Sequence, residues 1–331
     1  MKFKKCAALL LVSSCFLTGC TTSSAKKVDS KYVVASLEKG NKTKNIFADN
    51  LYKDIIDNSS NNSTVFNAVL QNLVDQKFPI NDDMKEDAAT IIKQIKSAYK
   101  SNYGDNYKDS LNQALTSAGY KNLSEYRQRM IKQIQYANFL LDYIDDHFDD
   151  VFNDYYQQCA PKYVSLIKIS VSDTSSPTDD ETSKLNEVKE LISNTDKSFG
   201  DIAQDYSDDS TSSKKGSLGI VDSKDTSGIA NSYGEDVFNA IEALSEGQVS
   251  DVITGNDGYY FVKVTSTDKK TLKKELKKTD IDSPLLAYDD YLQYVVYNSY
   301  KINYKDKDIK KIVQEVVNKA LEERKTERGE A

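Results

Sequence analysis

The chain has 331 residues, with 44 Lys and Arg, 51 Asp and Glu, and one His, so its net charge is −7. Its 13 glycines and 4 prolines exclude collagen-like and proline-rich classes and favour long helices. Aromatic residues make up 10% of the chain, which argues against full disorder. The length suggests roughly two domains. A single histidine excludes His-rich metal sites, and we expect neither a metal nor a cofactor.

The first residues predict an export signal. Lys2, Lys4 and Lys5 precede a short apolar segment, Cys6 to Phe16, which is too short to span a bilayer comfortably. A basic start followed by a short apolar segment is typical of a secretory signal peptide, which we place at residues 1–19.

The signal ends in Leu-Thr-Gly-Cys, with the cysteine at position 20. This string resembles the bacterial lipobox, in which small residues precede a lipidated cysteine. We therefore predict lipidation of Cys20, a polar tether over residues 20–40, and a position on the outer face of the bacterial cytoplasmic membrane. The alternative is an ordinary signal peptide with an incidental cysteine. An acidic chain needs such a lipid because an anionic membrane does not attract it. Cys159 would then be the remaining cysteine, so no intrachain disulfide is expected.

Residues 41–160 are expected to be helical. Apolar residues from Val65 to Val74 recur with a helical period, and Pro79 ends that segment. Further helical patterns cover residues 88–99 and 124–141. Six aspartates lie between Asp142 and Asp154, which indicates a solvated helix face; a calcium loop is the weaker alternative because its ligand alternation and turn glycine are missing.

Residues 161–268 show a different pattern. A β-branched run from Tyr163 to Val171 predicts a first strand, and Tyr259 to Val264 predicts a closing strand. Between them we expect a helix over residues 183–194, a second helix that begins after Ser198, and a short helix over residues 233–243. Strands at both ends with helices between them indicate a small α+β domain.

Residues 269–331 are expected to be helical again, with a last helix from Ile309 to Leu321. Tyrosines occupy every third position from 288 to 300. In a helix they would point in nearly all directions, so this segment is either buried by several partners or lines a cleft.

Residues 199–264 carry recognisable motifs. The run Phe199-Gly-Asp-Ile-Ala-Gln-Asp-Tyr-Ser-Asp-Asp209 resembles the F-x-x-L-A-x-x-Y-S-x-D run of bacterial parvulin domains, and Lys215-Gly-Ser-Leu-Gly219 resembles their G-G-D-L-G turn. The segments 238–250 and 258–264 resemble F-x-L-x-x-G-x-V-S and G-Y-H-I-I-K-V. With the lipobox and the flanking helices, the chain resembles PrsA-type foldase lipoproteins over residues 1–320.

The resemblance implies an α+β protein in which a parvulin-like domain, a four-stranded antiparallel sheet with helices, is inserted into a SurA-like helical chaperone domain made from the N- and C-terminal segments. It implies peptidyl-prolyl isomerase activity and assistance to secreted proteins that fold after translocation. The expected partners are unfolded secreted proteins with proline-containing segments, the membrane through the lipid on Cys20, and a second copy in a homodimer; no nucleic acid is expected.

The resemblance also assigns site residues. The family places one histidine on the first strand and one on the last, and here these positions hold Leu166, or Lys168 if the register shifts, and Tyr260. Asp209 matches the family's central Cys or Asp. The family's apolar proline pocket falls on Ile229, Tyr233 and Phe238. The one histidine, His147, lies outside this domain.

Loss of both histidines leaves two functions open. The first is a foldase whose isomerase activity is weak, and the second is a catalytically silent holdase or scaffold. A solute-binding lipoprotein is disfavoured because such chains usually have two α/β lobes. We also expect Tyr291 and Tyr294 to contribute to client binding; the alternative is that these tyrosines belong to the core.

Overall fold

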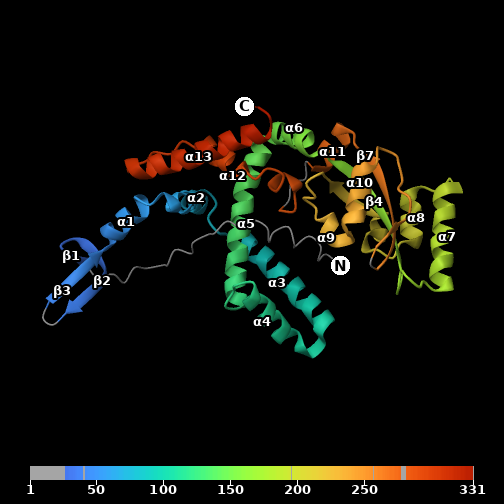
Figure 1. Ribbon diagram of the computed structural model, residues 1–331, viewed down its shortest axis with the longest axis horizontal. Helices are drawn as coiled ribbons and strands as arrows, with labels where there is room; N and C mark the ends of the chain where they lie inside the picture. Colours follow the sequence, from blue (N-terminus) through green and yellow to red (C-terminus); the bar gives the residue numbers. More distant parts are fainter. Residues whose placement is uncertain (1–26, 40–41, 195, 256, 277–280, 331) are drawn as a thin grey trace. The chain divides into compact units, whose positions relative to one another are not determined.

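The computed structural model describes residues 27–39, 42–194, 196–255, 257–276 and 281–330 (Figure 1). The predicted signal peptide and Cys20 lie outside the described residues, as does most of the predicted tether. Two compact units are formed. One contains Asn81–Asp290, and the other joins the described residues up to Ile80 with the described residues from Tyr291 onward.

The unit formed by both ends of the chain is mainly helical. Its helices are α1 (Ala48–Ile56), α2 (Asn62–Lys77), α12 (Leu292–Ser299) and α13 (Lys307–Glu327), with a 3₁₀ turn, η3, at Ser59–Asn61. Helix α2 packs on α13, and buried Phe66 of α2 stacks on Tyr294 of α12 with ring centroids 4.9 Å apart. Segments from the two ends of the chain therefore share one core, as the resemblance implies.

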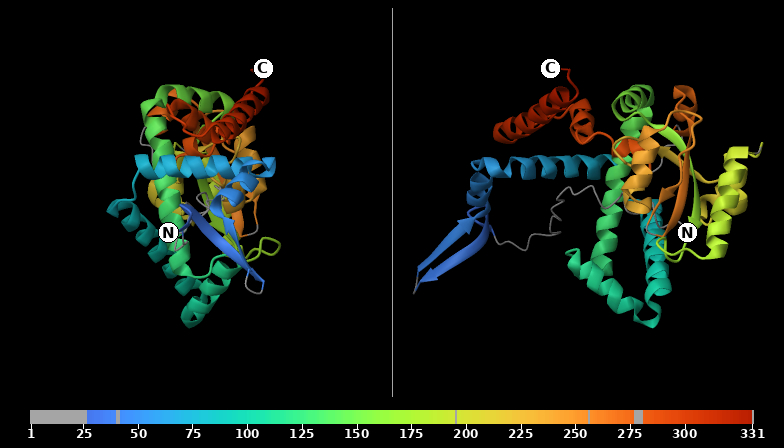
Figure 2. Two further views of the ribbon diagram at one scale, coloured as in Figure 1. Left: turned by 90° about the vertical axis from the view of Figure 1, so that its left-hand side faces the viewer. Right: turned by 45° about the vertical axis from the view of Figure 1, so that its right-hand side comes forward.

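The same unit begins with strands where the sequence analysis expects a tether and then helix. Strands β1 (Lys27–Val28), β2 (Lys31–Lys39) and β3 (Lys42–Phe47) form an antiparallel sheet in the order β1-β2-β3. Figure 2 shows this sheet in blue. The expectation of a helix from residue 41 is thus wrong for residues 42–47. The β-branched and aromatic residues 32–34 favour a strand, but the lysines and serines around them obscure that preference.

The other unit opens with four helices and a 3₁₀ turn, η4 (Gly104–Asn106). The helices are α3 (Asp82–Tyr103), α4 (Tyr107–Ser117), α5 (Leu123–Asp146) and α6 (Phe148–Cys159). The Asn122 side chain accepts a hydrogen bond from Glu125 N at 2.9 Å and begins α5. The acidic segment 142–154 is not one continuous helix face, because α5 ends at Asp146 and α6 begins at Phe148, on either side of His147. Asp149 and Asp150 then lie in the first turn of α6, where carboxylates favour the positive helix end.

A four-stranded antiparallel sheet follows, as predicted. Its strands are β4 (Lys162–Ser170), β5 (Ser217–Val221), β6 (Ile253–Thr254) and β7 (Gly258–Ser266), in the order β5-β4-β7-β6. The intervening helices are α7 (Asp179–Asn194), α8 (Phe199–Tyr206), α9 (Ile229–Tyr233) and α10 (Glu235–Ala243), with a 3₁₀ turn, η5, at Ser210–Lys214. Ser198 begins α8 as expected, because its hydroxyl accepts from Asp201 N. The α+β class is confirmed.

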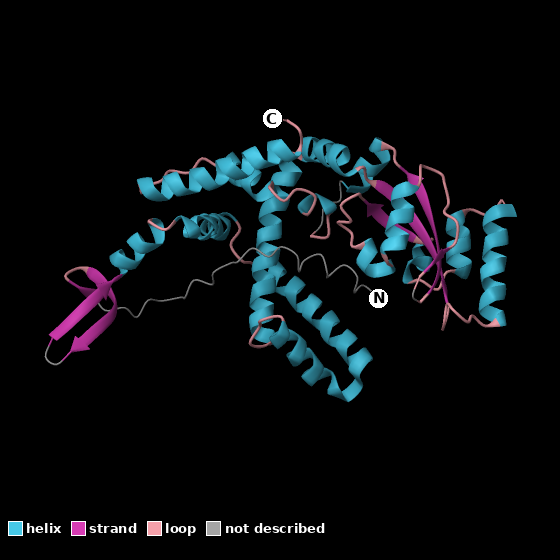
Figure 3. Ribbon diagram, in the orientation of Figure 1, coloured by secondary structure: helices cyan, strands magenta, loops and turns pink. Residues whose placement is uncertain are grey.

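Each face of this sheet has its own apolar cluster. Helices lie on both sides of the sheet (Figure 3). The register pairs Leu166 with Val262 and Ile167 with Phe261 across β4 and β7. Because neighbouring residues of a strand point to opposite faces, these pairs belong to different layers. The first layer packs on α9 and α10, and the second packs on α7 and α8. We call these the α9–α10 face and the α7–α8 face.

The tyrosine series does not form one helix. A short helix, α11 (Lys269–Leu276), and a 3₁₀ turn, η6 (Pro284–Leu286), precede it, and α12 begins only at Leu292. Tyr288 lies before that helix, where its hydroxyl donates to Asp154 at 2.8 Å and its ring meets Tyr155 edge to face. The spacing of three residues therefore spans a turn and a helix. Among the described helices, none is both long enough and apolar enough to cross a membrane.

Candidate active site

The positions predicted for the two histidines lie together on the α9–α10 face. Leu166 is fully buried and Tyr260 is 2% exposed, and both belong to one apolar cluster. Lys168 lies on the same face, because the register places it directly opposite Tyr260. Leu166 and Lys168 are two residues apart on β4. Both candidates for the histidine position of the first strand therefore lie on this face.

Asp209 is buried, at 8% exposure, directly before η5. Its carboxylate accepts a hydrogen bond from Thr211 N at 2.9 Å, so it caps this turn. The Tyr233 hydroxyl donates to the same carboxylate oxygen at 3.5 Å, a long contact. Burial, together with the nearby Asp209 charge, raises the pKa of Tyr233 well above its usual range. Asp209 therefore both caps the turn η5 and accepts a long hydrogen bond from the Tyr233 hydroxyl.

A second phenol–carboxylate pair lies on β7. The Tyr260 hydroxyl donates to one oxygen of Asp257, and Lys168 Nζ donates to the other. Burial and the hydrogen bond to Asp257 raise the pKa of Tyr260. Desolvation opposes ionisation of Asp257, but the hydrogen bonds from Lys168 and Tyr260 outweigh it, and the pKa of Asp257 is lowered. The Lys168 ammonium also lies 5.7 Å from the centre of the Tyr260 ring.

The two pairs meet through their rings. Tyr233 and Tyr260 pack edge to face, with centroids 6.1 Å apart and planes at 81°. This geometry is favourable for aromatic pairs. The arrangement therefore joins two phenols, two carboxylates and one ammonium at the margin of an apolar cluster. We call these five side chains the phenol network: Lys168, Asp209, Tyr233, Asp257 and Tyr260.

The residues predicted for the proline pocket pack against the same cluster. Ile229 is buried within it, while Tyr233 and Phe238 are partly buried beside it. The structure thus brings together all six predicted site residues of the parvulin-like segment: Leu166, Asp209, Ile229, Tyr233, Phe238 and Tyr260. Tyr291 and Tyr294 belong to the other unit, where Tyr291 donates to Glu327 at 2.6 Å and Tyr294 stacks on Phe66.

Two site residues are not identified by the sequence analysis. Asp257 lies in the turn before β7, and nothing in its local sequence distinguishes it from a turn aspartate. Thr211 carries a buried hydroxyl that has no hydrogen-bond partner within the described structure, two residues after Asp209. In the sequence, only its position two residues after Asp209 suggests that Thr211 lies at the site.

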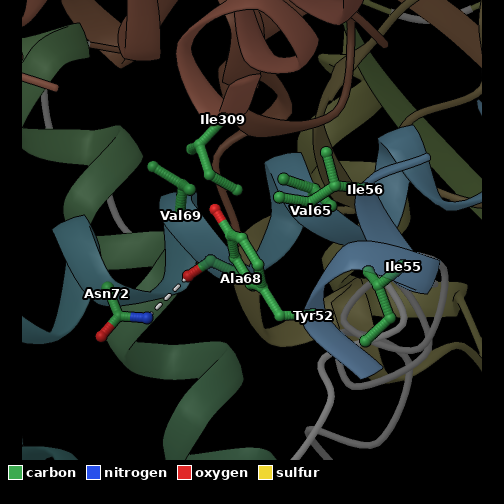
Figure 4. Close-up of a pocket in the computed structure, with 8 residues that line it drawn as sticks. All are labelled: Tyr52, Ile55, Ile56, Val65, Ala68, Val69, Asn72 and Ile309. Carbon is green, nitrogen blue, oxygen red and sulfur yellow. Dashed lines mark hydrogen bonds between the residues drawn. The ribbon is translucent and has the colours of Figure 1, made fainter. Parts of the chain in front are cut away.

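The unit formed by the two chain ends contains a separate apolar pocket of about 350 Å³ (Figure 4). The residues that line it come from α1, α2 and the start of α13, and Asn72 contributes an amide side chain to the lining. The Asn72 amide donates to the carbonyl of Ala68 at 2.8 Å, which satisfies one of its hydrogens. The lining is otherwise aliphatic and aromatic: Tyr52, Ile55, Ile56, Val65, Ala68, Val69 and Ile309.

Comparisons with known proteins find sequences similar to part of this chain. Residues 166–266 match the PPIC-type PPIase domain, Rotamase. Foldase protein PrsA of Staphylococcus aureus is 31% identical over 141 residues, which are 40% of this chain and 41% of that protein. Foldase protein PrsA of Staphylococcus epidermidis is 30% identical over the same shares. The match thus spans less than half the length of these relatives.

Among solved structures, PrsA from Bacillus subtilis shares 21% identity, with 85% of this chain and 98% of that chain covered and a TM-score of 0.39. The family match spans the sheet, the phenol network and the helices on both sides. Residues 166–266 are therefore similar to PPIC-type PPIase domains, and the predicted resemblance of the chain to PrsA-type parvulin foldases is confirmed.

Proposed function

We propose that this chain is an extracytoplasmic foldase with peptidyl-prolyl cis–trans isomerase activity. The observation that carries the proposal is the phenol network at the margin of the apolar cluster, within the segment that matches the PPIase family. An X-Pro bond isomerises in roughly 10–100 s without a catalyst, so it limits folding of exported chains. A catalyst at the site of export would shorten the time that folding intermediates remain exposed.

The reaction needs neither a covalent intermediate nor proton transfer. Rotation about the prolyl bond is slow because amide resonance makes it partly double. The proline ring would be held against apolar surface by Ile229, Tyr233 and Phe238. Water is excluded there, so it stabilises the polar planar amide less than it does in solution. The hydroxyls of Tyr260 and Thr211 are the proposed donors to the twisted amide. Tyr260 would exchange its hydrogen bond to Asp257 for one to the amide, and Asp209 fixes the loop that carries Thr211. Both raised phenol pKa values keep the tyrosines protonated, and therefore donating, at physiological pH.

The remaining parts of the proposal come from the sequence. We place the parvulin-like domain at residues 161–268, between chaperone segments at 41–160 and 269–331. Lipid on Cys20 would hold the chain on the outer face of the membrane, where unfolded secreted proteins emerge. Tyr291 and Tyr294 are proposed to contact these clients, and a homodimer is proposed as the assembly.

One observation favours the alternative, a catalytically silent holdase. Leu166 occupies a histidine position of the family and is fully buried, so it supplies no polar group there. A buried polar network that loses members seldom keeps its geometry. The Tyr260 hydroxyl is also already donating to Asp257. Under this alternative the domain binds proline-containing segments without accelerating isomerisation.

A protease-coupled assay on a proline-containing tetrapeptide separates the two functions. We expect the full chain to accelerate isomerisation, and Tyr260→Phe to lower the rate constant kcat/KM about tenfold, which corresponds to about 1.4 kcal/mol of transition-state stabilisation. Tyr206→Phe is the matched control, because this tyrosine donates to Glu187 at 2.8 Å beside the α7–α8 face. Unchanged rates in Tyr260→Phe would overturn the site. No acceleration by the wild type, with client aggregation still suppressed, would establish the holdase.

The client surface has its own test. The double variant Tyr291→Ser/Tyr294→Ser should weaken suppression of client aggregation. Tyr99→Ser/Tyr103→Ser, which removes two tyrosines that stack on each other, should not. Thermal unfolding of each variant shows whether the loss of the Phe66 contact acts through stability. Equal suppression by both double variants, with the Tyr291 and Tyr294 variant still folded, would show that these tyrosines are core residues.

A further inference from the structure

Exposed apolar side chains are concentrated in one short stretch of the chain. Within the described residues, all but one of the large hydrophobic side chains that are exposed lie between positions 32 and 55, each 43–46% accessible; the exception is Tyr103. Helix α1 buries none of its residues. Such a concentration marks an interaction surface rather than incidental exposure. The members are Tyr32, Val34, Ile46, Leu51, Tyr52 and Ile55.

Residues 27–56 carry a net charge of +2, although the whole chain carries −7. Six lysines stand there against four acidic residues: Lys27, Lys31, Lys39, Lys42, Lys44 and Lys53 against Asp29, Glu38, Asp49 and Asp54. Lys31 is paired with Asp49 at 3.1 Å, so the other lysines carry the excess positive charge. Lys27 Nζ lies 4.6 Å from the centre of the Tyr32 ring, so basic and aromatic groups share one surface. We call residues 27–56 the basic apolar arm.

The position of the arm in the chain points to its occupant. Residue 27 follows Cys20 by seven residues, and a chain of that length spans at most about 25 Å. If Cys20 is lipidated, as proposed above, the arm begins within that distance of the bilayer. A lipid-anchored chain would therefore present basic and aromatic side chains at headgroup level, where tyrosine rings and lysine stems are favoured.

We propose that the basic apolar arm lies against the anionic surface of the membrane and orients the anchored protein there. Anionic headgroups attract lysines, and the exposed Tyr, Val, Ile and Leu side chains enter the boundary between headgroups and acyl chains. A second copy of the chain is a poorer occupant, because a two-fold contact would place two surfaces of net positive charge against each other. The lipid alone tethers the chain, whereas the arm fixes its orientation.

The first test uses residues 20–331 with Cys20→Ser, so that no lipid masks the effect. Flotation with phosphatidylglycerol vesicles should show binding at least about tenfold tighter than with phosphatidylcholine vesicles, weakening as salt rises. Lys27→Glu/Lys44→Glu should reduce binding at least about tenfold, and Tyr32→Ser/Ile46→Ser several-fold. Lys93→Glu/Lys100→Glu makes the same charge change on exposed lysines of α3 and should have no effect. Absence of vesicle binding, or an equal loss in the α3 control, would overturn the proposal.

A second measurement does not depend on variants that fold. Amide hydrogen exchange on the lipidated chain in phosphatidylglycerol vesicles should show slower exchange over residues 32–56 than in detergent. Unchanged exchange there would contradict contact with the bilayer. Loss of client binding in the arm variants, with vesicle binding intact, would make the arm a polypeptide site and refute the membrane role. Isomerase activity is measured separately, so failure of this inference is distinguishable from failure of the proposed function.

Discussion

The two faces of the β4–β7 sheet use the same strands for different purposes. On the α7–α8 face, Ile167, Ile169 and Phe261 pack on helices whose contributions are apolar. On the α9–α10 face, Leu166 and Val262 pair across the two strands and belong to the apolar core. Two residues further along β4, Lys168 lies opposite Tyr260, and the face becomes polar. One strand thus supplies a closed core on one side and the phenol network on the other.

This difference separates what the fold requires from what the proposed site requires. The α7–α8 face needs volume and apolarity, which many sequences provide. The α9–α10 face needs particular donors at particular positions, and here two tyrosines, two carboxylates and a lysine occupy it without a histidine. Changes on the first face should alter stability, and changes on the second should alter activity as well.

The largest expected effect comes from a cavity in either layer. Ile167→Ala and Leu166→Ala each remove a fully buried side chain, and each should lower the free energy of unfolding by about 2–5 kcal/mol. Urea unfolding measures both. The isomerase rate per folded molecule should fall only for Leu166→Ala, because Ile167 points away from the phenol network. An equal fall in rate for both variants would remove the distinction between the faces.

A smaller loss of stability is expected from a crowded turn. Gly216 has φ = +76°, and a Cβ there would lie 2.4 Å from the carbonyl oxygen of Leu166. Gly216→Ala should therefore cost roughly 1–3 kcal/mol, since the neighbouring atom is backbone and cannot move aside easily. Gly219→Ala is the matched control, because its φ is +84° but a Cβ there meets open space. Equal unfolding midpoints in urea would show that close approach to β4 is unimportant.

The phenol network should make activity insensitive to pH near neutrality. The pKa values of Tyr233 and Tyr260 are raised and that of Asp257 is lowered, so these three groups do not titrate between about pH 6 and 9. A site built on histidines would change protonation in that range. We expect a flat profile of kcat/KM, and a several-fold lower rate in Asp257→Asn, which weakens the link to Lys168. A sigmoid near pH 6.5 would contradict this network.

Local sequence signals predict the fold where they are strong. Ser198 begins a helix and the β-branched run after Tyr163 forms β4, because capping and β-propensity act within a few residues. Residues 31–47 escape prediction because apolar and polar residues do not alternate regularly along them, so no period of two residues marks the strands. The tyrosine spacing misleads because a period of three residues does not reveal the turn before Leu292.

The site divides in the same way. Leu166, Asp209 and Tyr260 are predicted as site residues from the resemblance, and the structure places Leu166 and Tyr260 in one apolar cluster. Asp257 is not found, since its role depends on a contact with Lys168, 89 positions away, that only the paired strands create. Residues whose function depends on non-local pairing are therefore those that sequence reasoning misses.

The smallest effect concerns the loop at the end of β4, away from the phenol network. The Glu181 carboxylate accepts hydrogen bonds from the backbone N–H groups of Thr178, at 2.7 Å, and Ser172, at 2.8 Å, and these lower its pKa to about 2. Because the unfolded value is about 4.5, the stabilisation is complete above that pH and is lost as pH falls toward 2. Glu181→Gln should therefore reduce the dependence of stability on pH between about 4.5 and 2, as measured by urea unfolding. Asp180→Asn, a neighbouring acid on α7, should leave that dependence unchanged, and an equal reduction in both variants would show that overall charge, not the Glu181 hydrogen bonds, sets it.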